Sequence, residues 1–216
     1  MNGQRWICLD VGETLVDETR IWSAWADEAG VPRLTFLAAL GAVIARGLPH
    51  TAVFEVVGLG ADGWRERQDA VERRHGGLQP IDLYPDALPA MAALRAAGYR
   101  LAVVANQPVQ RHRQLREAGV APDAMAMSDE MQLFKPDPAF FARALELMGS
   151  PPPGDVAYVG DRVDNDVLPA IACGMRSVWI RRGPWGVIGE LPPGVQPALV
   201  VDSLAELVER VDEVWD

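Results

Sequence analysis

Acidic side chains stand directly after two apolar runs of the sequence, where a buried strand would end and a loop begin. Asp10 follows the run WICL, and Asp161, Asp164 and Asp166 follow the run DVAYVG within six residues. So dense a group of carboxylates is costly unless a positive charge neutralises it, and Mg²⁺ prefers a few carboxylates together with water and phosphate oxygens. We therefore expect a Mg²⁺ site made by Asp10 and this cluster; a solvated loop of charges is the alternative.

Two further polar residues could take part in the same chemistry. Asn106 follows the apolar run RLAVVA, and Lys135 stands before a proline in LFKPDP. A lysine ammonium is a good point charge for phosphoryl oxygens, and it would also anchor the charge of a nucleophilic aspartate. The alternatives are that Asn106 caps a helix and that Lys135 is a surface residue in a turn.

Five short runs of the sequence are apolar throughout rather than alternating, a pattern typical of buried parallel strands. These strands would position the polar residues described above. They span residues 6–9, 100–105, 155–160, 177–180 and 198–201. Helical stretches lie between them, so the pattern predicts an α/β fold with a doubly wound parallel sheet. Ligands bind beyond the carboxyl ends of the strands in such sheets, which is where Asp10, Asn106 and Asp161 stand.

Helix-period patterns fill the region from about residue 16 to residue 80, where strand signals are weak. This region predicts a helical insertion after the first strand. Residues 84–99 predict a helix that ends at Gly98. The last segment, DSLAELVERVDEVW, carries one apolar stripe behind Asp202 or Ser203 as N-cap, so it predicts a helix packed on the sheet.

The stretches LDVGETL, VVANQ, KPDP and VGDRVDND occur in this order between Leu9 and Asp166. In order, spacing and strand-end position they resemble the four motifs of the haloacid dehalogenase-like (HAD) hydrolase superfamily. The resemblance implies a Rossmann-like α/β core with a mostly helical cap inserted after the first strand. On this basis we expect a core of residues 1–15 and 81–216 and a cap of residues 16–80.

The resemblance also implies roles for single residues. Asp10 would be the nucleophile that takes up a phosphoryl group as an aspartyl phosphate. Asp10, Asp161 and the main-chain carbonyl of Gly12 would bind Mg²⁺. Asp166 would complete the metal site by holding the metal's water shell or Lys135. Lys135 would neutralise charge on the nucleophile and on the transferred group.

The substrate side of the site is implied in the same way. Asn106, Ala105 and Thr14 would lie against the substrate, and Asn165 would shape the loop of the fourth motif. Ala105 departs from the family pattern, which usually has a Ser or Thr there to donate to the phosphate.

A second departure is Gly12, because phosphatases of the family usually have an aspartate two residues after the nucleophile as general acid and base. Such groups typically contribute about 10²–10⁴-fold in rate. Glu13, or a cap residue such as Asp17 or Glu18, would have to supply the proton. Without such a group the reaction would favour good leaving groups.

The expected function is therefore that of a Mg²⁺-dependent phosphatase acting on a small phosphorylated molecule. One alternative is a relative that has lost efficient catalysis and binds a metal or ligand, which Gly12 and Ala105 favour. Another is a dehalogenase, since those members also lack the second aspartate. They generally do without Mg²⁺, however, and the retained GDRVDND argues against that reading.

Composition limits the partners and the compartment. The chain has 216 residues, 49% of them hydrophobic, with a formal charge of −10 and no long basic cluster, so we expect no nucleic-acid partner. The apolar runs are too short to cross a bilayer, and the N-terminus lacks the apolar region of a signal peptide. We expect a cytoplasmic protein without a membrane partner, in which Cys8 and Cys173 are buried structural thiols.

Three further features of the sequence are weaker signals of function. The stretch GLGADG, residues 58–63, fits a dinucleotide fingerprint, but it lies inside the helical region and predicts a turn between helices. The histidines show no ligand spacing and are expected to face solvent; they are His50, His75 and His112. Trp22, Trp25 and Trp64 either line the cap above the site or pack in its core.

Overall fold

A parallel six-stranded sheet forms the centre of the protein, with strand order β3-β2-β1-β4-β5-β6. The computed structural model describes residues 4–60 and 62–216. The strands are β1 (Trp6–Leu9), β2 (Arg100–Ala105), β3 (Ala124–Met127), β4 (Val156–Gly160), β5 (Arg176–Ile180) and β6 (Leu199–Val201). Five were predicted to within a residue; β3, with the sequence AMAM, was not, because it lacks the β-branched and aromatic residues that mark a strand.

The strands are apolar throughout because both faces of the sheet are covered. Alternate residues of a strand point to opposite faces. Ile7 and Leu9 belong to one hydrophobic cluster, and Trp6 and Cys8 belong to another on the opposite face. The fold is therefore the predicted Rossmann-like, doubly wound α/β fold.

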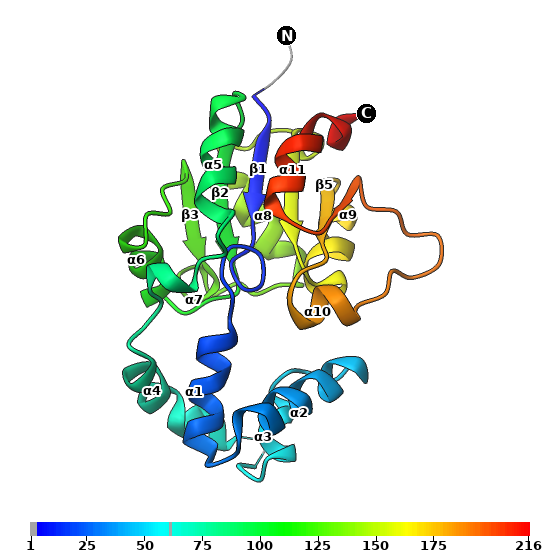
Figure 1. The fold of residues 1–216 in the computed structure, drawn as a ribbon. Coiled ribbons are helices and arrows are strands. Elements are labelled where there is room, and N and C mark those ends of the chain that lie inside the picture. The colour runs from blue at the N-terminus through cyan, green and yellow to red at the C-terminus, as the bar shows by residue number, and fades with distance from the viewer. Residues whose placement is uncertain (1–3, 61) are drawn as a thin grey trace.

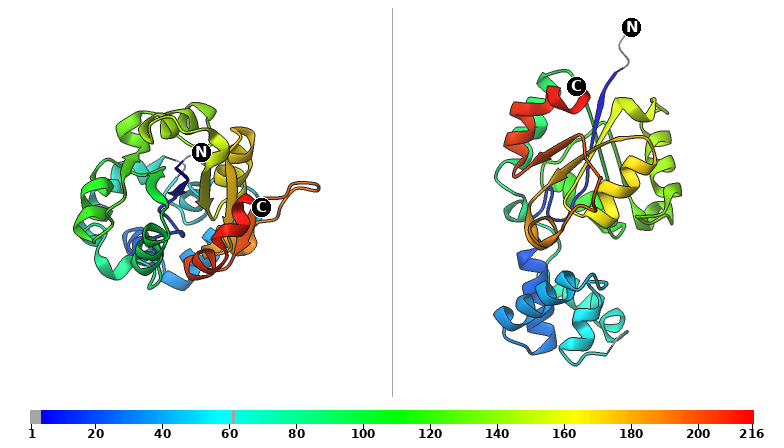
Figure 2. Two further views of the ribbon diagram at one scale, coloured as in Figure 1. Left: turned by 90° about the horizontal axis from the view of Figure 1, so that it is seen from above. Right: turned by 90° about the vertical axis from the view of Figure 1, so that its right-hand side faces the viewer.

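Helices of the core lie on both faces of the sheet (Figures 1 and 2). They are α5 (Ala87–Ala96), α6 (Gln110–Glu117), α7 (Ser128–Met131), α8 (Pro138–Leu147), α9 (Leu168–Ala172), α10 (Gly183–Ile188) and α11 (Leu204–Arg210). Helices α5 and α11 contribute to the first cluster, and α8 and α9 contribute to the second. Ser203 caps α11, as one of the two predicted N-caps, by accepting from the Glu206 N–H. The helix continues as a 3₁₀ turn over Val211–Trp215.

Among the described residues between β1 and α5, four α-helices occupy the region in which the sequence shows helix-period patterns. They are α1 (Thr19–Ala29), α2 (Arg33–Ala45), α3 (Ala52–Val56) and α4 (Gly63–His75). They share a hydrophobic core of their own that contains Trp22, Trp25, Phe36, Phe54 and Val71. The insertion lies beyond the carboxyl end of β1 (Figures 1 and 2). The exact domain boundaries at residues 15–16 and 80–81 stay a prediction.

Two smaller predictions concern the stretch GLGADG and the two cysteines. Residues 58–60 and 62 form part of the turn between α3 and α4, while residue 61 lies outside the described residues. The apolar stretch before this turn contains helix α3, not a strand, so a dinucleotide fingerprint lacks its required context. Cys8 is buried as predicted, whereas Cys173 is partly exposed, so that half of the prediction is wrong.

Within residues 4–60 and 62–216, no single helix is long and apolar enough to cross a membrane. Helices α1 and α2, bent by 111° at their junction, meet the length and composition criteria only as a pair.

Candidate active site

Three carboxylates meet at the carboxyl ends of β1 and β4, as the sequence predicts. Asp10, Asp161 and Asp166 are buried, and each offers a carboxylate oxygen within 4.8 Å of the other two. Asp166 lies in a π-helical turn, Val163–Val167, that follows β4 closely, and its Oδ2 accepts from the Arg162 N–H at 2.9 Å. Gly160 permits this turn, since a Cβ at this position would overlap the Asp166 side chain.

Lys135 is the cation of this cluster. Its Nζ donates to Asp10 Oδ1 at 2.7 Å and to Asp166 Oδ1 at 2.5 Å, and its side chain is 2% exposed. Burial by itself would lower the pKa of Lys135, but the two carboxylates raise it above its usual value, so the ammonium stays charged. Asn106 fixes the Lys135 backbone: its side-chain amide accepts from the Lys135 N–H at 2.8 Å and donates to the Lys135 carbonyl at 3.0 Å.

The cluster contains three carboxylates and one ammonium, and Lys135 donates to Asp10 and Asp166. Asp161 is the third carboxylate. Its Oδ2 atom is buried and has no hydrogen-bond partner among the described residues. Burial raises the pKa of Asp161 well above its ordinary value, and the neighbouring Asp166 and Asp10 raise it further. Burial also raises the pKa of Asp166 to about 6, although Lys135 opposes the shift. An all-oxygen donor set with surplus negative charge fits a hard divalent cation such as Mg²⁺.

Asp164, the remaining carboxylate of the predicted cluster, lies outside this group. Its side chain is 68% exposed and pairs with Arg162 at 2.7 Å.

The space beside Gly12 is occupied by another acid. A Cβ built on Gly12 would lie 2.7 Å from Glu18 Oε1 and 3.0 Å from Glu18 Cδ. The Glu18 carboxylate therefore fills the position in which a side chain at residue 12 would start. Trp22 Nε1 donates to it at 3.3 Å, and Gln107 Nε2 donates at 3.5 Å. Burial raises the pKa of Glu18, and the charge of Arg111 offsets part of that shift.

Glu13 is also buried, but protein donors hold both of its carboxylate oxygens. Oε1 accepts from the Glu18 N–H at 3.1 Å, and Oε2 accepts from the Tyr84 hydroxyl at 2.5 Å. Burial, followed by the charge of Glu18, raises the pKa of Glu13 to about 7. Its backbone has a φ of 52°, in the left-handed region that favours glycine.

A cavity of about 210 Å³ opens between these residues and the helical insertion. Most of the predicted site residues line it: Asp10, Gly12, Glu13, Asn106, Lys135, Asp161 and Asn165. Thr14 and Ala105 do not, since both are completely buried, and Thr14 Oγ1 has no hydrogen-bond partner among the described residues.

Trp22 and His50 of the insertion and Trp185 of α10 also line the cavity. Trp22, predicted either to line the cap above the site or to pack in its core, does both. His50 packs edge to face against both Trp22 and Trp185, with centroid distances of 5.9 and 6.1 Å, and these two rings also contact each other at 6.4 Å. Burial lowers the pKa of His50 to about 4. The expectation that the histidines face solvent is wrong for His75, which is 7% exposed. No spacing rule could have found His50, because its neighbours are distant in sequence.

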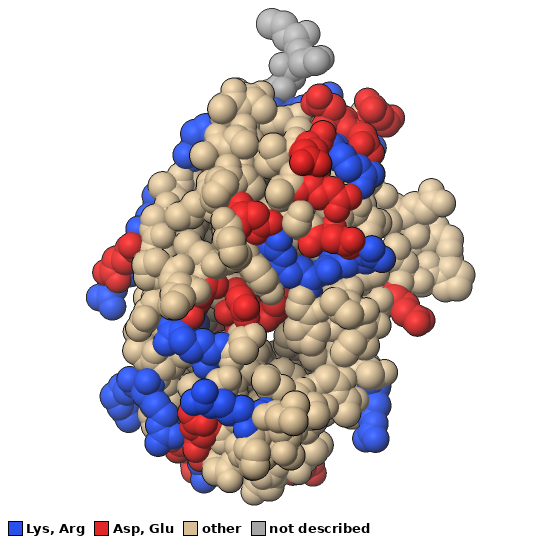
Figure 3. Space-filling view, in the orientation of Figure 1, with Lys and Arg blue, Asp and Glu red and all other residues tan. Residues whose placement is uncertain are grey.

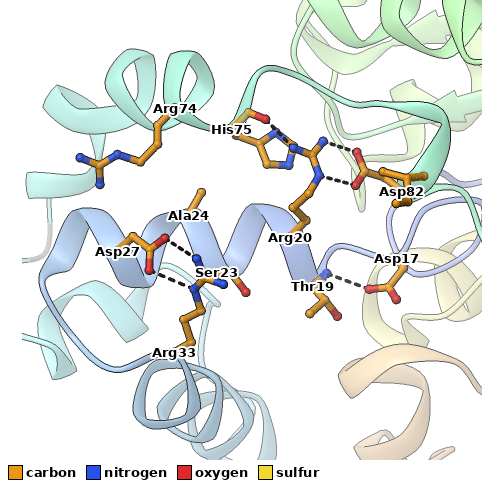
Figure 4. A pocket seen from close by; sticks show the side chains of 11 residues that line it. Asp17, Thr19, Arg20, Ser23, Ala24, Asp27, Arg33, Arg74, His75 and Asp82 are labelled. Carbon is orange, nitrogen blue, oxygen red and sulfur yellow. Dashed lines mark hydrogen bonds and ion pairs between the residues drawn. The ribbon is translucent and has the colours of Figure 1, made fainter.

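A different cavity, of about 430 Å³, lies where the insertion joins the core (Figure 4). Arg20 crosses this junction from α1. Its guanidinium donates to both Asp82 carboxylate oxygens and to the backbone carbonyls of His75 and Gly77. One side chain thus ties the start of the insertion to the segment that leaves it.

The protein has a Rossmann-like sheet, buried carboxylates and a lysine beyond the strand ends, and a helical insertion next to them. This combination defines a class of α/β hydrolases. The family profile of the haloacid dehalogenase-like hydrolases matches residues 4–174, and the chain belongs to this family.

Curated relatives match part of the chain. It is 32% identical over 134 residues to a glyceraldehyde 3-phosphate phosphatase of Methanopyrus kandleri, which covers 61% of the chain and 57% of that protein. It is 35% identical over 128 residues to a phosphoserine phosphatase of Thermus thermophilus, which covers 58% of the chain and 49% of that protein. The chain thus spans about half the length of these relatives.

Solved structures match the fold over nearly the whole chain. The HAD-hydrolase YfnB of Bacillus subtilis, crystallised with magnesium, has a TM-score of 0.75 at 18% identity and covers 98% of this chain and 100% of its own. The L-2-haloacid dehalogenase RSc1362 has a TM-score of 0.72 at 20% identity, with the same coverage. At these identities the likeness establishes the fold alone.

Proposed function

We propose that the protein is a Mg²⁺-dependent phosphatase that acts on a small phosphorylated molecule, with the helical insertion as its cap. The observation that carries this proposal is the buried cluster of three carboxylates and Lys135, in which Asp161 Oδ2 has no partner among the described residues. Two of its relatives named above are phosphatases of small phosphorylated molecules.

Asp10, Asp161 and the Gly12 carbonyl would hold the Mg²⁺, with Asp166 beside them, and the ion would supply charge to neutralise phosphoryl oxygens. The chain's own residues do the rest. The Asp10 carboxylate attacks phosphorus and becomes an aspartyl phosphate as the bond to the leaving oxygen breaks. Lys135 stays charged and balances the negative charge that gathers on Asp10 and on the transferred group.

In this proposal Glu18 moves the proton that the leaving group needs, which is supported by the position of its carboxylate beside Gly12. Its carboxyl gives a proton to the leaving oxygen, and the resulting carboxylate then takes a proton from the water that attacks the aspartyl phosphate. Asp10 is thereby restored and inorganic phosphate is released. Glu13, predicted as a candidate for this role, accepts from Tyr84 at 2.5 Å and from the Glu18 N–H at 3.1 Å, which are shorter hydrogen bonds than the 3.3 and 3.5 Å contacts of the Glu18 carboxylate. We assign Glu13 to positioning Glu18.

The proposal is tested with purified protein and 4-nitrophenyl phosphate, a substrate whose leaving group needs little acid assistance. Hydrolysis should require Mg²⁺, stop with a chelator and be abolished by Asp10→Asn. Asp164→Asn is the matched control, because Asp164 is exposed and lies outside the cluster. Absence of hydrolysis, or equal hydrolysis with Mg²⁺, with chelator and by Asp10→Asn, contradicts the proposal.

Gly12 is the observation that favours a dehalogenase as a second candidate. A (S)-2-haloacid dehalogenase of Pseudomonas sp. is 30% identical over 123 residues, 56% of the chain and 53% of that protein. Chelator-resistant halide release from 2-chloropropionate, lost in Asp10→Asn, would support this candidate. Asp161 Oδ2, which has no partner among the described residues, favours the phosphatase, because a bound cation would stabilise the ionised form of this buried carboxyl.

A further inference from the structure

We infer that a second cavity beside the catalytic one binds a planar, uncharged ring, and that the substrates are phosphate monoesters whose leaving group carries such a ring. This inference rests on the proposed phosphatase function and adds the chemical class of the substrate. The site that takes the ring is called the ring chamber below.

The ring chamber has a volume of about 210 Å³ and adjoins the catalytic cavity. Trp22, His50 and Gln107 line both cavities, so a ligand can extend from one into the other. Each cavity alone is smaller than the roughly 300–1,000 Å³ that is usual for small-molecule sites, whereas the two together reach this range. A phosphoryl group beside Asp10 would thus have its leaving group in the ring chamber. Figure 3 shows a hollow between the insertion and the core, with acidic side chains beside it.

Aromatic side chains dominate the insertion side of the ring chamber. Trp25, Phe54 and Trp64 line it together with Trp22. The Trp25 and Phe54 rings pack at a centroid distance of 4.6 Å, and Phe54 stacks on Trp64 at 6.2 Å. Phe54 is 2% exposed and Trp25 8%, so these rings are fixed in place. Packed aromatic walls favour another ring, which can stack on them or meet them edge to face.

The charges of the ring chamber are already paired. Among its described lining residues, Glu72 and Arg111 are the charged ones, and they form an ion pair at 3.6 Å. Arg111 also donates to the Gln107 and Gln114 side chains. Burial lowers the pKa of His50, the remaining titratable lining residue, to about 4, so this ring is neutral near pH 7. A second phosphate, carboxylate or ammonium on the substrate would find no free counter-charge there.

The experiment compares substrates that differ in the ring but share a primary alkyl leaving oxygen. We expect kcat/KM for 2-phenylethyl phosphate to exceed that for n-butyl phosphate by at least about tenfold, the scale on which apolar pockets discriminate. We expect 2-cyclohexylethyl phosphate, which is apolar but not planar, to fall between them. Trp64→Leu should reduce the ratio of 2-phenylethyl to n-butyl phosphate several-fold. Trp215→Leu, a tryptophan at the far end of the core, should leave it unchanged.

A binding measurement keeps the inference testable apart from turnover. With Mg²⁺, 2-phenylethylphosphonate should bind more tightly than n-butylphosphonate in calorimetry, and Trp64→Leu should reduce the difference while circular dichroism shows that the variant is folded. Equal binding of the two phosphonates, or a preference that Trp64→Leu leaves intact, overturns the inference. Acetyl phosphate, which has no ring, reports on the proposed function alone: its hydrolysis without any ring preference refutes the ring chamber but not the phosphatase.

Discussion

At the scale of single residues, the distinctive feature of the site is that Gly12 has no side chain and the Glu18 carboxylate occupies the space beside it. The usual acid of the family is absent from residue 12, and the Glu18 carboxylate fills the space that its side chain would need. An acid that arrives from the insertion depends on the position of α1, whereas an acid at residue 12 would be fixed next to the nucleophile. In the proposed reaction, proton transfer by Glu18 is therefore coupled to the placement of the insertion.

Removing the proposed acid should cost most for poor leaving groups. Glu18→Gln is expected to lower kcat/KM for an alkyl phosphate by about 10²–10⁴-fold and to affect 4-nitrophenyl phosphate far less, because a nitrophenolate leaves without a proton. Steady-state kinetics on a series of leaving groups measures this difference. Glu13→Gln is the comparison: if it shows the larger dependence on leaving group, Glu13 and not Glu18 is the acid.

The occupied space beside Gly12 also allows a rescue experiment. Gly12→Asp alone places a side chain against Glu18, whereas Gly12→Asp combined with Glu18→Ala gives the new carboxylate room. The double variant should therefore hydrolyse alkyl phosphates faster than Glu18→Ala alone. An equally slow double variant would mean that the space beside Gly12 is not where the proton is delivered.

At the scale of elements, the insertion and the core are joined through Arg20. Its guanidinium bridges α1 to the segment that follows α4 (Figure 4), through the Asp82 carboxylate and two backbone carbonyls. A lysine cannot reproduce this arrangement, because the planar fork of arginine reaches several acceptors at once.

Arg20→Lys should destabilise this junction. Hydrogen bonds to charged groups contribute about 1.5–3 kcal/mol each, and partial exposure of Arg20 places the expected loss near the lower end, about 2 kcal/mol. Chemical denaturation measures the loss. Arg33→Lys is the matched control, since its Asp27 pair is exposed and such pairs contribute about 0–1 kcal/mol. Equal effects of the two substitutions would show that Arg20 is an ordinary surface arginine.

At the scale of the whole molecule, the proposed Mg²⁺ site in the buried carboxylate cluster would link metal binding to stability. An ion that binds the folded state alone stabilises it by about 2.7 kcal/mol at 100 times its Kd, which corresponds to a rise in Tm of about 5–10 °C for a chain of this size. We therefore expect Mg²⁺ to raise the Tm of the unmodified protein.

Asp161→Asn separates two effects of the Asp161 carboxyl: its cost to the folded state without metal and its proposed contribution to Mg²⁺ binding. Without Mg²⁺ the variant should melt at a higher temperature than the unmodified protein, because folding no longer buries a carboxyl whose ionised form is costly at this position and whose Oδ2 has no partner among the described residues. Mg²⁺ should raise the Tm of the variant only slightly, because one of the ligands proposed for the ion has been removed. Differential scanning calorimetry with and without Mg²⁺ measures both, and an undiminished Mg²⁺ response in Asp161→Asn would remove Asp161 from the metal site.

The sequence by itself determined the class of fold and the convergence of Asp10, Asn106 and Asp161, and only the resemblance to the family motifs added Lys135 to them. Apolar runs define buried parallel strands, and in parallel sheets the residues after neighbouring strands meet at one edge. It missed β3, whose AMAM sequence carries no strand signal. These inferences depend on local patterns, which act over a few residues.

The tertiary structure alone decided which further side chains surround the carboxylate cluster. It put Glu18 in the volume beside Gly12, buried Thr14 away from the cavity, and joined α1, α3 and α4 into the ring chamber. These contacts link residues far apart in the chain, and they depend on how the insertion packs against the core. Such packing is set by the fit of whole surfaces, which no short-range pattern records.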